Sequence, residues 1–157
     1  MATEPLGGYR HTEVREARTK KDWADFVAAL LEGPYAGAEK TVLVMDSLNT
    51  HGIPSLYERF PPAAARRYAE RLEIHFTPKH GSWLDIAEIE LATLAAQCFK
   101  NRRIGSIEEL AKETLARESS RNEKQKDVDL RFATSDARTR LKHLYPTIEI
   151  EERIKRE

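Results

Sequence analysis

The sequence predicts an α/β fold, because segments with strand and helix patterns alternate along the chain after residue 19. The clearest strand is the continuous apolar run Thr41–Met45, and a second strand, Leu72–Phe76, alternates apolar with polar residues. The clearest helix begins at Thr19, a good capping residue, and ends at Gly33. The length of 157 residues suits one domain with one modest core. We expect this domain to span residues 1–146, followed by a charged tail over residues 147–157.

In the first half of the chain, Glu4–Ala17 is predicted to form a pair of strands broken at Gly7 and Gly8. The helix that follows has one apolar face, made of Trp23, Phe26, Val27, Leu30 and Leu31. The run Thr41–Met45 indicates a central strand that is buried on both faces. Helical segments are expected around 56–60 and, after two prolines, as far as residue 71.

In the second half, Ser82 is expected to cap a long helix. Its predicted buried side consists of Leu84, Leu91, Leu94, Ala95 and Cys98. Ser106 begins a capping box and opens another helix, with Ile107, Leu110, Ala111 and Leu115 facing inward. Residues 119–129 are predicted to form a polar connection, and a last helix is expected over residues 135–144.

Composition limits the classes of function. The chain has 26 basic and 26 acidic residues, so it lacks the basic excess of many DNA-binding proteins, and any contact with DNA must come from local patches. A single cysteine, Cys98, excludes an internal disulfide and fits a cytoplasmic protein. We expect no membrane span, because no apolar stretch approaches the roughly 20 residues required, and Met1–Arg10 lacks a secretory signal.

Two carboxylates are candidates for chemistry. Asp46 ends the apolar strand, at the sheet edge where α/β proteins bind ligands, although aspartate is also a common turn residue. Glu88 shares a helical face with Leu84 and Leu91, where a carboxylate is costly unless it is paired or bound to a metal. The alternative is that Glu88 reaches solvent at the edge of this face, while Glu90 has the more exposed position.

If Asp46 and Glu88 converge, they make a pocket rich in oxygen atoms. Two carboxylates about 4 Å apart repel by roughly 4 kcal/mol at an effective dielectric constant of about 20, and a divalent cation reverses the sign of that energy. Mg²⁺ and Mn²⁺ prefer oxygen ligands. Such a pair could therefore support metal-dependent phosphoryl transfer.

Three segments of the chain form an ordered set of motifs. Val42–His51 reads VLVMDSLNTH, Thr77–Glu88 reads TPKHGSWLDIAE, and Phe132–Pro146 reads FATSDARTRLKHLYP. Each resembles, in the same order, a segment of the mariner-related bacterial insertion-sequence DDE transposases. The resemblance extends from about Glu4 to Pro146.

The resemblance implies an RNase H-like fold, a mixed sheet flanked by helices, that uses three acidic residues and two metal ions to cleave and join DNA. It makes Asp46 the second acid and Glu88 the third, with Mg²⁺ or Mn²⁺ as the bound ion. It also places four residues in the active site or against DNA: His51, Lys79, His80 and Trp83. A short basic cluster, Lys100, Arg102 and Arg103, is a further candidate for DNA binding, or else a solvated helix end.

The chain departs from the family pattern at its start. The family's first aspartate lies on a strand ahead of the segment that here begins at Glu4, and residues 1–21 contain no aspartate. The family's helix-turn-helix region is also absent, and Ser47 and Asp85 stand where the family has asparagine. We therefore expect a part of the catalytic domain that lacks the first strands, is inactive alone and associates with itself through an open sheet edge. It would be either a degraded copy or the second frame of a frameshifted element.

Two other functions stay open. One is a small, self-sufficient metal-dependent nuclease in which Asp85 or Glu13 supplies the third ligand. The other is a regulatory fragment that binds DNA or a full-length transposase. A thiol or serine hydrolase is not expected, because Cys98 lies on the predicted buried side of its helix and the sequence has no nucleophile elbow.

Overall fold

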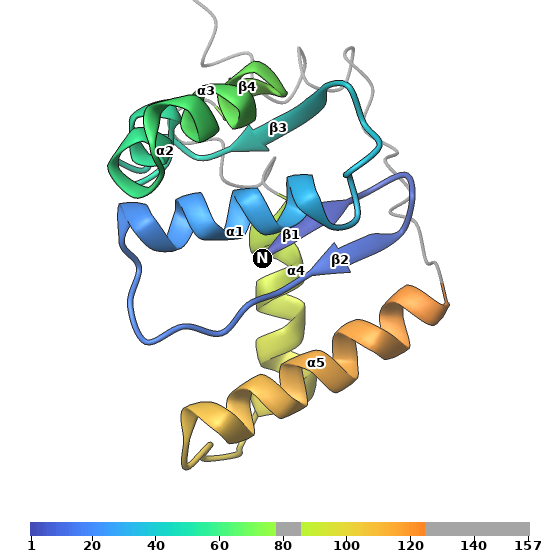
Figure 1. The fold of residues 1–157 in the computed structure, drawn as a ribbon. Helices are drawn as coiled ribbons and strands as arrows, with labels where there is room; N and C mark the ends of the chain where they lie inside the picture. Colours follow the sequence, from blue (N-terminus) through green and yellow to red (C-terminus); the bar gives the residue numbers. More distant parts are fainter. Residues whose placement is uncertain (78–85, 125–157) are drawn as a thin grey trace, which may run out of the picture. The chain divides into compact units, whose positions relative to one another are not determined.

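The computed structural model describes residues 1–77 and 86–124, which belong to one compact unit (Figure 1). It confirms the predicted mixture of helices and strands: small sheets are flanked by helices. In chain order the elements are β1 (Ala2–Glu4), β2 (Tyr9–His11), α1 (Lys20–Glu32), β3 (Thr41–Met45), α2 (Ile53–Arg59), α3 (Pro62–Glu70), β4 (Leu72–Phe76), α4 (Ile86–Leu94), the π-helical turn η2 (Ala95–Phe99) and α5 (Ile107–Glu123).

The first sheet is the antiparallel hairpin β1–β2, in which Ala2 pairs with His11 and Glu4 with Tyr9. The chain turns at the two predicted glycines. Gly8 adopts a φ of 67°, a conformation that glycine reaches without a steric penalty. The strands are shorter than the predicted span, because β2 ends at His11 and the following residues lead to α1.

The second sheet pairs β3 with β4 in parallel, with Thr41 opposite Leu72 and Met45 opposite Phe76. Met45 and Leu72 belong to the core, but Val42 and Val44 are 60% and 58% exposed. The expected burial on both faces is therefore wrong. Successive strand residues point to opposite faces, and within the described residues helices cover only the face that carries Met45. The second edge of β3 has no strand partner in this part of the chain.

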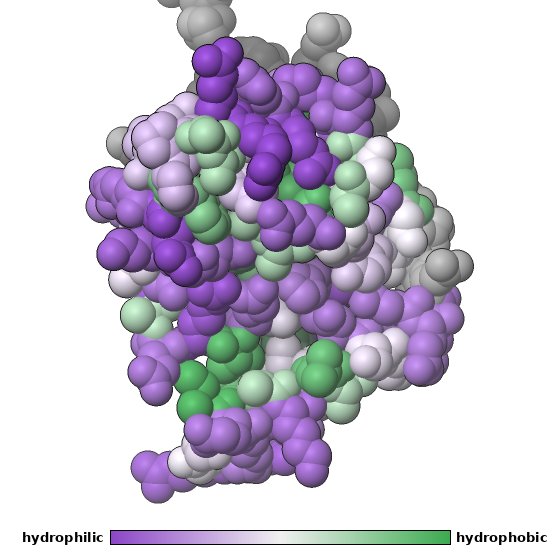
Figure 2. Space-filling model, in the orientation of Figure 1, coloured by the Kyte–Doolittle hydropathy of each residue, from purple (hydrophilic) through white to green (hydrophobic). Residues whose placement is uncertain are grey.

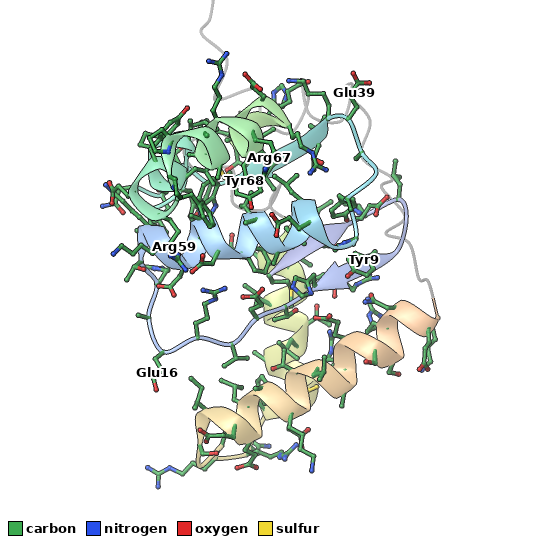
Figure 3. The ribbon with its side chains drawn as sticks, in the orientation of Figure 1. Tyr9, Glu16, Glu39, Arg59, Arg67 and Tyr68 are labelled. Carbon is green, nitrogen blue, oxygen red and sulfur yellow. The ribbon has the colours of Figure 1, made fainter. Side chains whose placement is uncertain are left out.

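The core lies where α1, α2 and α3 meet the β3–β4 sheet. It consists of Trp23, Ala24, Val27, Ala28, Leu31, Met45, Leu56, Ala65, Tyr68 and Leu72. Thr19 and Asp22 form the capping box that starts α1, as the sequence indicates. In Figure 3, Tyr68 lies between α3 and α1, where its hydroxyl donates a hydrogen bond to Glu32. The apolar face predicted for α1 is confirmed at Trp23, Val27, Leu30 and Leu31.

The predicted buried faces of α4 and α5 are only partly right: Leu94 is buried as expected, but other apolar positions of both helices are exposed. Leu91 is 45% exposed and Leu115 is 61% exposed, whereas Glu90 and Thr114 are buried. Both helices also contact the hairpin through polar side chains, so the apolar pattern marks only part of the buried side. Figure 2 shows a largely hydrophilic face with apolar side chains gathered around α4 and α5. Helix α5 also continues to Glu123, into the segment expected to be a connection.

Several predicted features lie outside the described residues. These are the helix start at Ser82, the acid Asp85, and the last helix over residues 135–144. Within residues 1–77 and 86–124, no helix is long and apolar enough to cross a membrane.

Candidate active site

Asp46 follows β3 directly, at the end of the strand where the sequence places it. Its side chain is 54% exposed, and its Oδ1 atom lies 2.7 Å from Nδ1 of His51. The intervening loop is held by its own hydrogen bonds. The His51 amide donates to the carbonyl of Leu48 at 2.9 Å, and the Ser55 hydroxyl donates to the carbonyl of Thr50 at 2.8 Å.

His51 lies between Asp46 and the core. Its ring stacks on the indole of Trp23, with the two centroids 6.0 Å apart and the planes at 28°. Trp23 is only 9% exposed and is anchored in α1. The imidazole is therefore held on one side by a buried aromatic residue and on the other by a carboxylate.

Asp46 and His51 line an open cavity of about 1290 Å³. Its walls come from β1, α1, β3 and the first part of α4, and Glu88 and Leu91 belong to the wall formed by α4. The two predicted acids thus border the same space, although they come from different elements. Arg15 and Arg18 also line this cavity, so its rim carries both charge signs.

The burial of Glu88 and Glu90 is the reverse of what the sequence predicts. Glu88 is exposed, so the predicted inward orientation is wrong, while Glu90 is only 5% exposed. The Glu90 carboxylate accepts hydrogen bonds from Arg10 at 2.9 Å and from Arg121 at 3.0 Å. Burial alone would raise the pKa of Glu90, but the hydrogen bonds and charges of these arginines outweigh it and hold the pKa below its ordinary value. Glu90 is thus engaged in structure and does not line the cavity.

The sequence matches the family model described as DDE superfamily endonuclease over residues 1–111. This range contains the hairpin, both strands of the second sheet, Asp46 and Glu88. The chain belongs to the DDE endonuclease superfamily. No curated protein and no solved structure gives a match. Members of this superfamily act on DNA and generally use divalent metal ions.

Six residues of this DDE endonuclease chain that are proposed from the sequence for DNA binding fall into two groups. Lys79, His80 and Trp83 lie outside the described residues. Lys100, Arg102 and Arg103 follow η2, and none of them lines the cavity. The guanidinium of Arg102 pairs with Glu113 at 3.1 Å.

Sequence reasoning overlooked two cavity residues, Arg15 and Arg18. The signal that could have found them is the basic segment Arg15–Lys21, which has four cations in seven residues. Arg15 pairs with Glu13 and, at 3.3 Å, with Asp22. Arg18 is exposed and has no hydrogen bond or ion pair among the described residues, so its charge is available to an anion such as a phosphate.

The donors present suit a hard divalent cation. Asp46 and Glu88 supply carboxylate oxygens to one cavity, and Mg²⁺ is commonly held by one or two carboxylates together with water and substrate phosphates. Among residues 1–77 and 86–124, no cluster of three or more ligating side chains is present. Asp46 and Glu88 are therefore the residues of this part of the chain that could hold such a cation together with phosphate and water.

Proposed function

We propose that the chain is part of the catalytic domain of a DDE transposase of the mariner-related insertion-sequence type, with an RNase H-like fold that spans residues 1–146. Asp46 and Glu88 are its second and third acids and bind Mg²⁺ or Mn²⁺. The observation that carries the proposal is that both carboxylates border one cavity at the end of β3. The family match over residues 1–111 and the order of the sequence motifs support it.

In this proposal each residue has a defined task. Asp46, at the end of β3, and Glu88, in the first turn of α4, would hold the cation through their carboxylate oxygens. Arg18 attracts the phosphate backbone of DNA to the rim of the cavity. Divalent cations bound there would supply the charge that activates the attacking oxygen and stabilises the leaving oxygen in phosphoryl transfer.

We further propose that the chain alone does not cleave DNA, because the first acid of the family pattern is missing from residues 1–21. The test is nicking of supercoiled plasmid with Mn²⁺, with the Asp46→Asn variant as the control. We expect both proteins to leave the plasmid intact. In parallel, electron paramagnetic resonance of free Mn²⁺ should show weak binding by the chain that Asp46→Asn or Glu88→Gln reduces further. Unchanged Mn²⁺ binding in both variants would exclude this pair of acids as the metal site.

A second candidate is the self-sufficient nuclease, and one observation favours it. Glu13 lines the same cavity as Asp46 and Glu88, although the three carboxylates do not form a metal-binding cluster among the described residues. Its carboxylate already pairs with Arg15 and, at 3.4 Å, with His11. Nicking by the unmodified chain that Glu13→Gln abolishes would establish this function in place of the inactive fragment.

The same structure supports self-association. The second edge of β3 is without a strand partner in the described residues, and the exposed Val42 and Val44 form an apolar strip beside it. An unpaired strand with exposed apolar side chains is prone to pair with another chain. A regulatory role, in which the fragment binds DNA or a complete transposase, would use this edge or the basic cluster after η2.

A further inference from the structure

We propose that His51 is a positioning residue, which holds the Asp46 carboxylate in the orientation that binds the cation. The inference rests on the proposed function, because it assigns a task to a neighbour of the proposed metal ligand. His51 does not bind the cation in this arrangement.

The contact between the two side chains is specific. Nδ1 of His51 lies 2.7 Å from Oδ1 of Asp46, and we assign the ring proton to Nδ1 so that the imidazole donates. This contact leaves the other carboxylate oxygen, Oδ2, for the proposed cation. Hydrogen bonds of this kind orient metal ligands and raise affinity.

The imidazole is itself held in place. Trp23 stacks against it from the core, and the loop hydrogen bonds of Leu48 and Thr50 fix the backbone on which His51 sits. Gly52 follows at a φ of 145°, a conformation that side-chain-bearing residues rarely adopt, and it starts α2. The His51 side chain is only 23% exposed, against 54% for Asp46. The His51 imidazole is thus held in place and donates to the Asp46 carboxylate. This hydrogen bond restrains a side chain that would otherwise exchange between staggered rotamers in solvent.

The chain contains a second histidine–carboxylate pair that serves as a matched control. His75 lies 2.8 Å from Glu73 on β4, but both side chains are more than half exposed, at 56% and 57%. Neither residue lines the cavity, and no aromatic ring stacks on His75 among the described residues. The two pairs share their chemistry and differ in support and location.

The first experiment measures Mn²⁺ affinity by electron paramagnetic resonance in five proteins: the unmodified chain, Asp46→Asn, His51→Phe, His51→Asn and His75→Phe. Phenylalanine keeps the ring that stacks on Trp23 and removes the donor, and loss of such a supporting hydrogen bond typically weakens metal binding about 10–100-fold. Asparagine retains a donor near the Nδ1 position, so His51→Asn should restore much of the affinity. His75→Phe should have no effect.

The outcomes separate the inference from the proposed function. If His51→Phe binds Mn²⁺ as tightly as the unmodified chain while Asp46→Asn does not, the positioning role is overturned and the proposed metal site stands. An unmodified chain that binds no Mn²⁺ would overturn both.

A second readout requires no metal. Nitrogen-15 NMR of the imidazole should place the proton on Nδ1 of His51, and Asp46→Asn should shift that resonance while the His75 resonances stay unchanged. An unchanged His51 resonance in Asp46→Asn would show that the pair does not form in solution and would overturn the inference.

Discussion

At the scale of single residues, Glu90 joins three parts of the fold. Its carboxylate contacts Arg10 of β2 and Arg121 of α5, and Arg117 lies 3.8 Å away. Asn122 secures the same junction, because its side chain accepts a hydrogen bond from the Arg10 amide at 2.9 Å and donates one to the Arg10 carbonyl at 2.8 Å. One buried anion thus neutralises part of the charge of three arginines that would otherwise repel one another.

Removing the charge of Glu90 should destabilise the protein strongly. The Glu90→Gln variant takes the anion from the buried Arg10 and from the partly buried Arg117 and Arg121, and losing one partner of a buried ion pair costs about 3–5 kcal/mol. Urea unfolding followed by circular dichroism measures this loss. Glu88→Gln is the matched control, because Glu88 is an exposed glutamate on the same helix, and it should change the free energy of unfolding by no more than about 0.5 kcal/mol. Equal effects of the two substitutions would contradict this role for Glu90.

The stabilisation by Glu90 should depend on pH. Because its pKa is lower in the folded protein than in the unfolded chain, the stabilisation is complete above the ordinary glutamate pKa and disappears as the pH falls through the lowered value. Thermal melts of the unmodified chain and Glu90→Gln, from neutral pH to about pH 2, should therefore converge at the acid end. A difference that stays constant across this range would argue against a charged Glu90 in the fold.

The sequence predicts some of these residues and not others. The position of Asp46 follows from local information, because it directly ends an apolar strand. The exchanged environments of Glu88 and Glu90 do not, since the helical pattern locates apolar neighbours but not buried arginines. The partners of Glu90 are supplied by β2 and α5, which are distant in sequence.

At the scale of elements, α1 is the helix on which both the core and the candidate site depend. It supplies Trp23 to each of them. Its start is fixed by Thr19, whose side chain accepts from the Asp22 amide at 3.2 Å, while the Asp22 carboxylate accepts from the Thr19 amide at 2.7 Å. Two backbone donors at the helix start are satisfied in this way.

Replacing Thr19 by alanine should lower the free energy of unfolding by about 1 kcal/mol, the usual cost of losing such a cap. Arg18→Ala, one position earlier and exposed, is the control and should be nearly neutral. Amide hydrogen exchange should show faster exchange in the first turn of α1 for Thr19→Ala alone. Equal exchange in the two variants would contradict the capping role.

Element boundaries set by caps and prolines are predictable from the sequence, as the start of α1 and the break before α3 show. The burial of β3 is not. An apolar run shows that a strand has two apolar faces, but it does not show which layers cover them, so the exposure of Val42 and Val44 required the structure. The buried face of α5 was missed for a related reason, because that face is polar and depends on its contacts with the hairpin.

At the scale of the whole molecule, the apolar strip on β3 should govern association. Val44→Lys places a charge on this strip and should shift the protein toward monomer in analytical ultracentrifugation. Leu6→Lys is the control, because Leu6 is 79% exposed in the hairpin turn and is remote from β3 in the sequence. A clean monomer of the unmodified chain at high concentration would argue against association through this surface.

The two hydrogen bonds between Asn122 and Arg10 connect positions 112 residues apart along the chain. An isolated two-stranded hairpin is only marginally stable in water, and the β1–β2 hairpin gains the last of its stabilising partners among the described residues only after α5 has been synthesised. At about 5–20 residues per second, translation of the intervening chain takes several seconds. During that interval the emerging protein presents an incomplete hairpin to chaperones and proteases, while α1, β3 and β4 are already available to form the core.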